Sequence, residues 1–63
     1  MKSADIMFRS ENGRYRVLYR RDDMGMKYRV QKYDEALSIW TSIHYTDSPL
    51  DALTVMKRAA KEW

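Results

Sequence analysis

The chain has 63 residues, of which 44% are hydrophobic and 33% charged, and its formal net charge is +3. This composition is typical of a folded chain, and the length leaves room for only one small domain, residues 1–63. The absence of cysteine excludes disulfides and thiolate metal sites, and no apolar run approaches the roughly 18 residues of a membrane span. No secretory signal is recognisable, so we expect a cytoplasmic protein.

The first part of the chain predicts two strands joined by a tight turn. A short strand is expected over residues 5–9, although its pattern leaves open whether it forms. The Asn12-Gly13 pair then suits a hairpin, because both residues accept a positive φ angle. Residues 14–21 form the clearest strand, since aromatic and aliphatic residues alternate there with basic ones.

Two further strands and a helix are predicted in the remainder. Residues 22–25 (Asp-Asp-Met-Gly) indicate a turn, and the strands that follow are expected over residues 26–33 and 37–45. A helix over residues 49–62 is announced by Ser48, which can cap its first turn.

The start and the apolar stripe of this helix can both be read from the residue types. Pro49 suits the first helical position, and the carboxylate of Asp51 can bond back to the cap residue. The apolar residues at helical spacing are Ala52, Leu53, Met56, Ala59, Ala60 and Trp63. This stripe is the only available cover for the sheet, which needs one to be stable.

We therefore predict an α+β fold in which an antiparallel three- or four-stranded β-meander packs against one C-terminal α-helix. The expected core consists of Tyr15, Val17, Tyr28, Val30, Ile39, Ile43, Leu53, Met56 and Ala60. The opposite face of the sheet is expected to carry Arg14, Arg16, Arg20, Lys27, Arg29, Gln31, Tyr33, Trp40, Ser42 and His44.

The basic character of that opposite face is the feature with functional content. Residues 14–33 hold seven basic and two acidic side chains, a net charge of +5. The candidate residues for binding nucleic acid or a protein partner are Arg14, Arg16, Arg20, Lys27, Arg29, Tyr33, Trp40 and His44. Basic groups can contact phosphates while an aromatic ring stacks on a base, and Trp, Tyr and Arg are also enriched in protein interfaces. A plain solvated face, or burial of the face in a homodimer, are the alternatives.

Catalysis and cofactor binding find little support in the residue inventory. The chain has one histidine and no cysteine, and its serines lie in no recognisable nucleophile motif, so no enzyme is expected. His44 alone cannot form a zinc site, which needs three or four ligands. Asp22, Asp23 and Gly25 lack the later ligand positions of a calcium loop, and no cofactor is predicted.

Two segments carry a family resemblance: IMFRSENGRYRVLYRRDDMGMKYRV, and then TDSPLDALTVMKRAA as the closing helix. This order resembles the arm-type DNA-binding domain of phage integrases, which has three strands and a helix, and its layout is similar to the plant ethylene-response-factor domain. The resemblance implies that the sheet face lies in the major groove of DNA through Arg14, Arg16, Arg20, Arg29 and Trp40. It also implies a phage or plasmid accessory protein that binds DNA, or that binds and inhibits or modulates a host protein through the same face.

Overall fold

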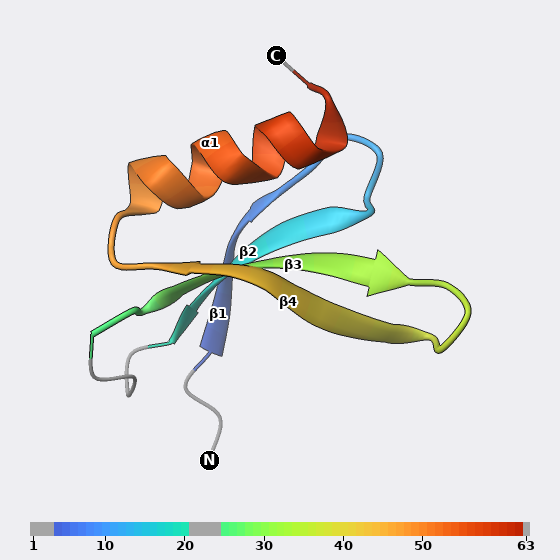
Figure 1. Cartoon of the computed structure of the whole chain (residues 1–63), viewed down its shortest axis with the longest axis horizontal. Coiled ribbons are helices and arrows are strands. Elements are labelled where there is room, and N and C mark those ends of the chain that lie inside the picture. Colours follow the sequence, from blue (N-terminus) through green and yellow to red (C-terminus); the bar gives the residue numbers. More distant parts are fainter. Residues whose placement is uncertain (1–3, 21–24, 63) are drawn as a thin grey trace.

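A computed structural model describes residues 4–20 and 25–62, which form a four-stranded antiparallel sheet and one helix (Figure 1). The elements are β1 (Ala4–Arg9), β2 (Tyr15–Arg20), β3 (Tyr28–Asp34), β4 (Ile39–Thr46) and α1 (Pro49–Ala60). The strands lie side by side in chain order, so each pairs only with its neighbours in the sequence. The predicted α+β meander with a C-terminal helix is confirmed, and the short first strand does form.

The turn between β1 and β2 follows the sequence prediction. Gly13 has a φ angle of 74°, and the amide of Ser10 donates to the carbonyl of Tyr15 at 2.9 Å. The side-chain oxygen of Asn12 accepts from the Ser10 hydroxyl at 2.6 Å and from the Arg14 amide at 2.9 Å. These contacts delay the start of β2 to Tyr15. The turn predicted over residues 22–25 lies outside the described residues apart from Gly25, whose φ angle is 98°.

The turn between β3 and β4 is longer than expected. The Asp34 carboxylate accepts from the amides of Ala36 and Leu37 at 3.0 and 3.3 Å, and Ser38 adopts a φ angle of 56°. The turn therefore includes Leu37, and β4 begins at Ile39 rather than at residue 37.

Both edge strands contain a bulge, and the bulges change which side chains share a face. In β1, Ile6 pairs with Leu18 and Phe8 with Val17, so one residue is extra. In β4, His44 pairs with Val30 and Ser42 with Gln31. Side chains of β4 were expected to alternate strictly between the two faces, with His44 opposite the helix. This expectation is wrong, because the extra residue turns His44 toward the helix.

The core lies between α1 and the central strands. Val17, Val30, Ala52 and Met56 are at most 2% exposed, and the half-buried residues packed against them are Phe8, Tyr15, Tyr28, Leu53 and Val55. The predicted core positions in β2 and β3, and Met56 and Leu53 in α1, are therefore confirmed. Ala60 is half-buried and lies outside this cluster.

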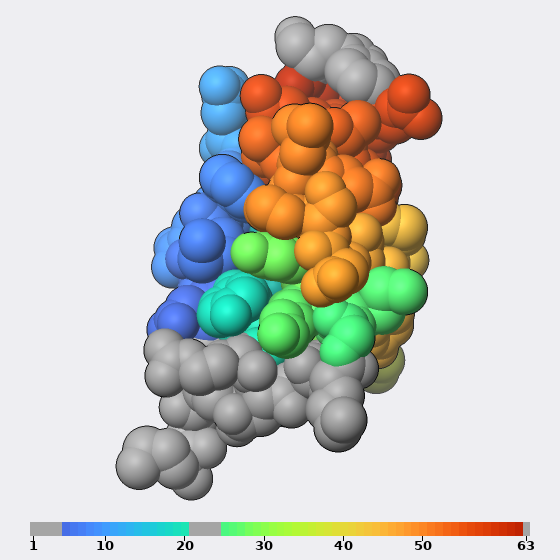
Figure 2. Space-filling model, turned by 90° about the vertical axis from the view of Figure 1, so that its left-hand side faces the viewer, coloured from blue at the N-terminus to red at the C-terminus, as the bar shows by residue number. Residues whose placement is uncertain are grey.

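Ile39 and Ile43 were predicted to be buried, and this prediction is wrong: they are 49% and 46% exposed. Both belong to an edge strand, and one helix about 10 Å wide cannot cover four strands that span about 14 Å between their outer axes. Figure 1 shows the first half of β4, in dark yellow, extending away from α1. The molecule is thin, with principal extents of 28 × 26 × 15 Å, and Figure 2 shows it turned by 90°.

The N-terminal cap of α1 differs from the expected capping box. The Ser48 hydroxyl accepts from the Asp51 amide at 3.3 Å, as predicted. The backbone amide of Ser48, however, donates to the Thr46 hydroxyl at 3.2 Å. The Asp51 carboxylate instead meets Nε2 of His44 at 2.9 Å, which ties the helix start to β4.

The helix ends earlier than expected, and Glu62, just beyond its end, contacts the β1–β2 turn. Lys61 has a φ angle of 59°, and the Glu62 amide donates to the carbonyl of Lys57 at 2.9 Å, which stops the helix at Ala60. The Glu62 carboxylate then accepts from the backbone amides of Glu11 and Asn12 at 2.9 and 3.1 Å. This contact joins the end of α1 to the first hairpin.

Candidate functional site

The sheet face opposite α1 is called the open face here. Cross-strand partners share a face, so the register defines its members. They are Ile6, Leu18, Arg29 and Tyr45 in one row, Arg9, Arg16, Gln31 and Ser42 in the next, Tyr33 and Trp40 at one end, and Arg20 at the other.

The open face is strongly basic. Its four arginines come from β1, β2 and β3, whereas the two acidic residues of the described strands lie on the helix side. Asp5 pairs with Tyr19 and Asp34 pairs with Ile39, both of which alternate away from the open face. Within the described strands, therefore, the open face combines four guanidinium groups with no carboxylate.

Arg16 is held in a fixed orientation at the centre of the open face. Its guanidinium carbon lies 4.1 Å from the ring centroid of Trp40, and its Nε donates to Oε1 of Gln31 at 2.9 Å. Gln31 is only 9% exposed and donates in turn to the Ser42 hydroxyl at 3.2 Å. A guanidinium stacked on an aromatic ring keeps its remaining N–H groups available for an anion.

A second arginine is stacked in the same way on the neighbouring row. The guanidinium carbon of Arg29 lies 5.1 Å from the ring centroid of Tyr45, whose side chain is 50% exposed. Trp40 is more enclosed, because Tyr33 meets it edge-on at 5.2 Å while Arg16 covers its ring. Of the two stacked rings, Tyr45 leaves more surface for a ligand.

Arg9 and Arg16 lie directly opposite each other on β1 and β2. Burial and, secondly, the charge of Arg9 lower the pKa of Arg16 from its ordinary value. Like charges in opposite positions are unfavourable, so an anion placed between them would be stabilising. A hollow of about 120 Å³ lies here, lined by Ile6, Arg9, Gly13, Tyr15, Arg16 and Trp40.

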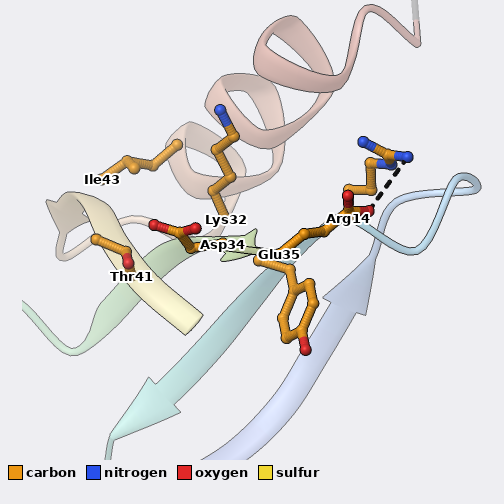
Figure 3. A pocket seen from close by; sticks show the side chains of 7 residues that line it. Arg14, Lys32, Asp34, Glu35, Thr41 and Ile43 are labelled. Carbon is orange, nitrogen blue, oxygen red and sulfur yellow. Dashed lines mark ion pairs between the residues drawn. The ribbon is translucent and has the colours of Figure 1, made fainter. Parts of the chain in front are cut away.

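A larger hollow of about 390 Å³ lies beside the end of β3 and the first part of β4, and Figure 3 shows its side chains. Its lining residues are Arg14, Lys32, Tyr33, Asp34, Glu35, Thr41 and Ile43. Arg14 forms an ion pair with Glu35 at 3.3 Å, and the lining as a whole has two cations and two carboxylates. This balance makes it a poorer site for a polyanion than the open face.

The structure brings together five of the eight residues that the sequence singled out. Arg16, Arg29, Tyr33 and Trp40 share the open face, with Arg20 at its end, and Lys27 lies just before β3.

Two of the expected residues lie elsewhere. His44 was expected on the open face and lies on the helix side, where it contacts Asp51. Arg14 lies in the turn before β2 and lines the larger hollow instead. Sequence reasoning missed Arg9, because no face was predicted for the first strand, and Tyr45, which reaches the open face because of the bulge in β4.

Comparisons with protein-family models, with curated proteins and with solved structures give no match. Within residues 4–20 and 25–62, no helix has the length and apolar character that crossing a membrane requires. The same part of the chain contains no group of three or more His, Asp or Glu side chains placed to hold a metal ion. The geometry of the open face is therefore the basis for a functional proposal.

Proposed function

We propose that the protein is a non-enzymatic binding module whose open face binds the phosphate backbone of nucleic acid. DNA is the nucleic acid that we propose as its main ligand. The observation that carries this proposal is the gathering of four arginines on one face of the described strands without a carboxylate. Phosphate contacts supply most of the sequence-independent affinity of such proteins, and a guanidinium can contact a phosphate through two N–H groups at once.

The aromatic residues support this role by fixing the arginines. Arg16 is stacked on Trp40 and hydrogen-bonded to Gln31, so it loses little conformational freedom when it contacts a phosphate. Stacking of a base or sugar is assigned to Tyr45, which is 50% exposed, rather than to Trp40, which Arg16 and Tyr33 enclose.

The width of the sheet bears on how DNA would lie. Four strands spaced by about 4.8 Å span about 14 Å, whereas the major groove is about 12 Å wide. The complete face is wider than the groove, so the proposed mode differs from the insertion into the groove that the resemblance to arm-type domains implies. We propose contacts along the phosphates, with little sequence preference, and a single strand can lie across the same face.

Fluorescence anisotropy with labelled single-stranded and duplex DNA of one sequence tests the proposal over a series of salt concentrations. Three phosphate contacts predict a slope of log K against log salt of about −2.7 on duplex and about −2.1 on a single strand. Arg9→Gln removes one phosphate contact and should reduce the magnitude of this slope by about 0.7–0.9. Lys57→Gln makes the same charge change on an exposed position of α1 and should leave the slope nearly unchanged. Affinity that does not vary with salt, or equal effects of the two variants, would contradict the proposal.

A protein partner is the second candidate, and the exposed apolar residues of the open face favour it. Ile6 and Tyr45 are 40% and 50% exposed beside the stacked arginines, a mixture that is typical of interface hot spots. Such a partner would fit a phage-type accessory protein that modulates a host protein. A pull-down from host lysate with and without nuclease separates the two candidates: a captured protein that survives nuclease and is lost with Tyr45→Ala supports this one.

A further inference from the structure

Strand β4 forms one edge of the sheet, so one side of its backbone has no strand partner among the described residues. Its sequence, IWTSIHYT, contains no Lys, Arg, Asp, Glu, Pro or Gly. Natural edge strands are usually protected by charges, prolines or bulges. β4 has only the bulge, whereas the opposite edge, β1, has a bulge and two charged residues, Asp5 and Arg9.

Exposed apolar side chains also gather on β4. Ile39, Ile43 and Tyr45 are between 46% and 50% exposed, and Leu37 in the preceding turn is 65% exposed. Ile39 pairs with Asp34 on the helix side, and Ile43 lies beside Thr41 on the same side (Figure 3). The histidine of the strand, His44, is already in contact with Asp51. This edge thus combines backbone groups that no described strand pairs with, an apolar surface and a sequence without Lys, Arg, Asp or Glu.

We propose that β4 pairs with β4 of a second copy of the chain, antiparallel and about a two-fold axis at Thr41. In this register Thr41 faces Thr41 of the partner subunit, and Ile39 faces Ile43 of the partner subunit on the helix side. On the open face Trp40 faces Ser42 of the partner subunit. Each exposed isoleucine then gains an apolar neighbour from the other copy.

A second copy of the chain suits this edge because β4 itself carries no Lys, Arg, Asp or Glu side chain. Two copies of an uncharged strand approach each other without charge repulsion, and β4 is the one described strand without a Lys, Arg, Asp or Glu residue. Among the described residues, few apolar side chains are buried, namely Val17, Leu18, Val30, Ala52 and Met56. A small chain with such a core gains stability from further burial in a dimer.

The two-fold axis is perpendicular to the sheet, so both open faces lie on the same side of one continuous eight-stranded sheet. The pairing does not depend on what the open face binds. Its failure would therefore leave the nucleic-acid proposal intact, and the reverse also holds.

Sedimentation equilibrium from micromolar to millimolar concentration tests the dimer in the absence of nucleic acid. The unmodified chain should form dimers, and Ile39→Lys should be monomeric over the same range. Leu50→Lys is the matched control, because it also places a lysine at an exposed aliphatic position, 72% exposed, but on α1. It should dimerise like the unmodified chain. If the unmodified chain is monomeric at every concentration, the proposal is overturned, even if β4 binds an extended peptide of another protein. A dimer that persists in Ile39→Lys also overturns it.

A disulfide tests the register and does not depend on the lysine variant folding. The chain has no cysteine, so Thr41→Cys introduces a single thiol at the proposed axis. Directly opposite Cα atoms in antiparallel strands lie about 4.5–5.5 Å apart, which is within the range that a disulfide spans. Under mild oxidation Thr41→Cys should form a covalent dimer on a non-reducing gel much faster than the control Leu50→Cys. Equal rates for the two variants would overturn the proposed register.

Discussion

Replacing Met56 with alanine is expected to remove a large part of the stability of the domain. Met56 is 2% exposed and lies in the core with Val17 and Val30, which are fully buried. Truncation of a buried methionine to alanine costs about 2–5 kcal/mol because it removes apolar burial and leaves a cavity. At about 0.05–0.15 kcal/mol per residue, the whole chain of 63 residues has a stability of about 3–9 kcal/mol.

The assay is thermal and urea unfolding followed by far-ultraviolet circular dichroism. A loss of 2 kcal/mol or more should lower the Tm of Met56→Ala by about 8 °C or more. Leu50→Ala is the control within the same helix: Leu50 is 72% exposed, and leucine and methionine have similar helix propensities. Its effect should stay within about 0.5 kcal/mol. Similar losses for the two variants would refute the placement of the core under Met56.

Three further outcomes follow from local contacts. Hydrogen bonds from His44 and, secondly, Thr46 lower the pKa of Asp51 in the folded chain. The ionised carboxylate therefore stabilises the fold above the pKa of an unfolded aspartate, about 3.9. This stability is lost as the pH falls through the lower folded pKa. The urea midpoint should therefore fall less steeply between about pH 5 and pH 2 in Asp51→Asn than in the unmodified chain. Glu62→Ala removes the acceptor of two backbone amides and should cost about 1–2 kcal/mol, with faster hydrogen exchange in the first hairpin turn; unchanged exchange there would contradict the contact. Gly13→Ala places a side chain on a residue with a φ angle of 74° and should lower the stability of the domain by about 1 kcal/mol. Space for the methyl group is available, so the cost comes from the backbone angle alone. A stabilised variant would refute the turn geometry.

The parts of the fold that could be predicted depend on local signals. The Asn12-Gly13 pair and the Ser48-Pro49 pair each act within a few residues, so they locate a turn and a helix start correctly. The alternation in β2 and β3 also predicts burial well, because these central strands pair with each other without a bulge. Arg16 and Arg29 could therefore be assigned to the open face from the sequence.

The features that the sequence did not predict depend on how neighbouring elements pack against each other. A bulge is a property of a pair of strands and has no reliable signal in either one, so the exchange of His44 and Tyr45 between faces could not be read from alternation. The exposure of Ile39 and Ile43 depends on how far a single helix reaches across the sheet. For the candidate site, Arg14 was included because β2 was expected to start one residue earlier than it does, and Arg9 was missed because no face was assigned to the first strand.

The order of the strands also has a consequence for how the chain folds. Since every strand pairs with the preceding one, the sheet can grow by successive closures of short loops, each with a small entropic cost. The contact between the Glu62 carboxylate and the Glu11 amide joins residues 51 positions apart, and it can form only after α1 has docked. We therefore expect the hairpins to form early and this contact last. Mutations at Glu62 should then accelerate unfolding and leave the rate of folding nearly unchanged.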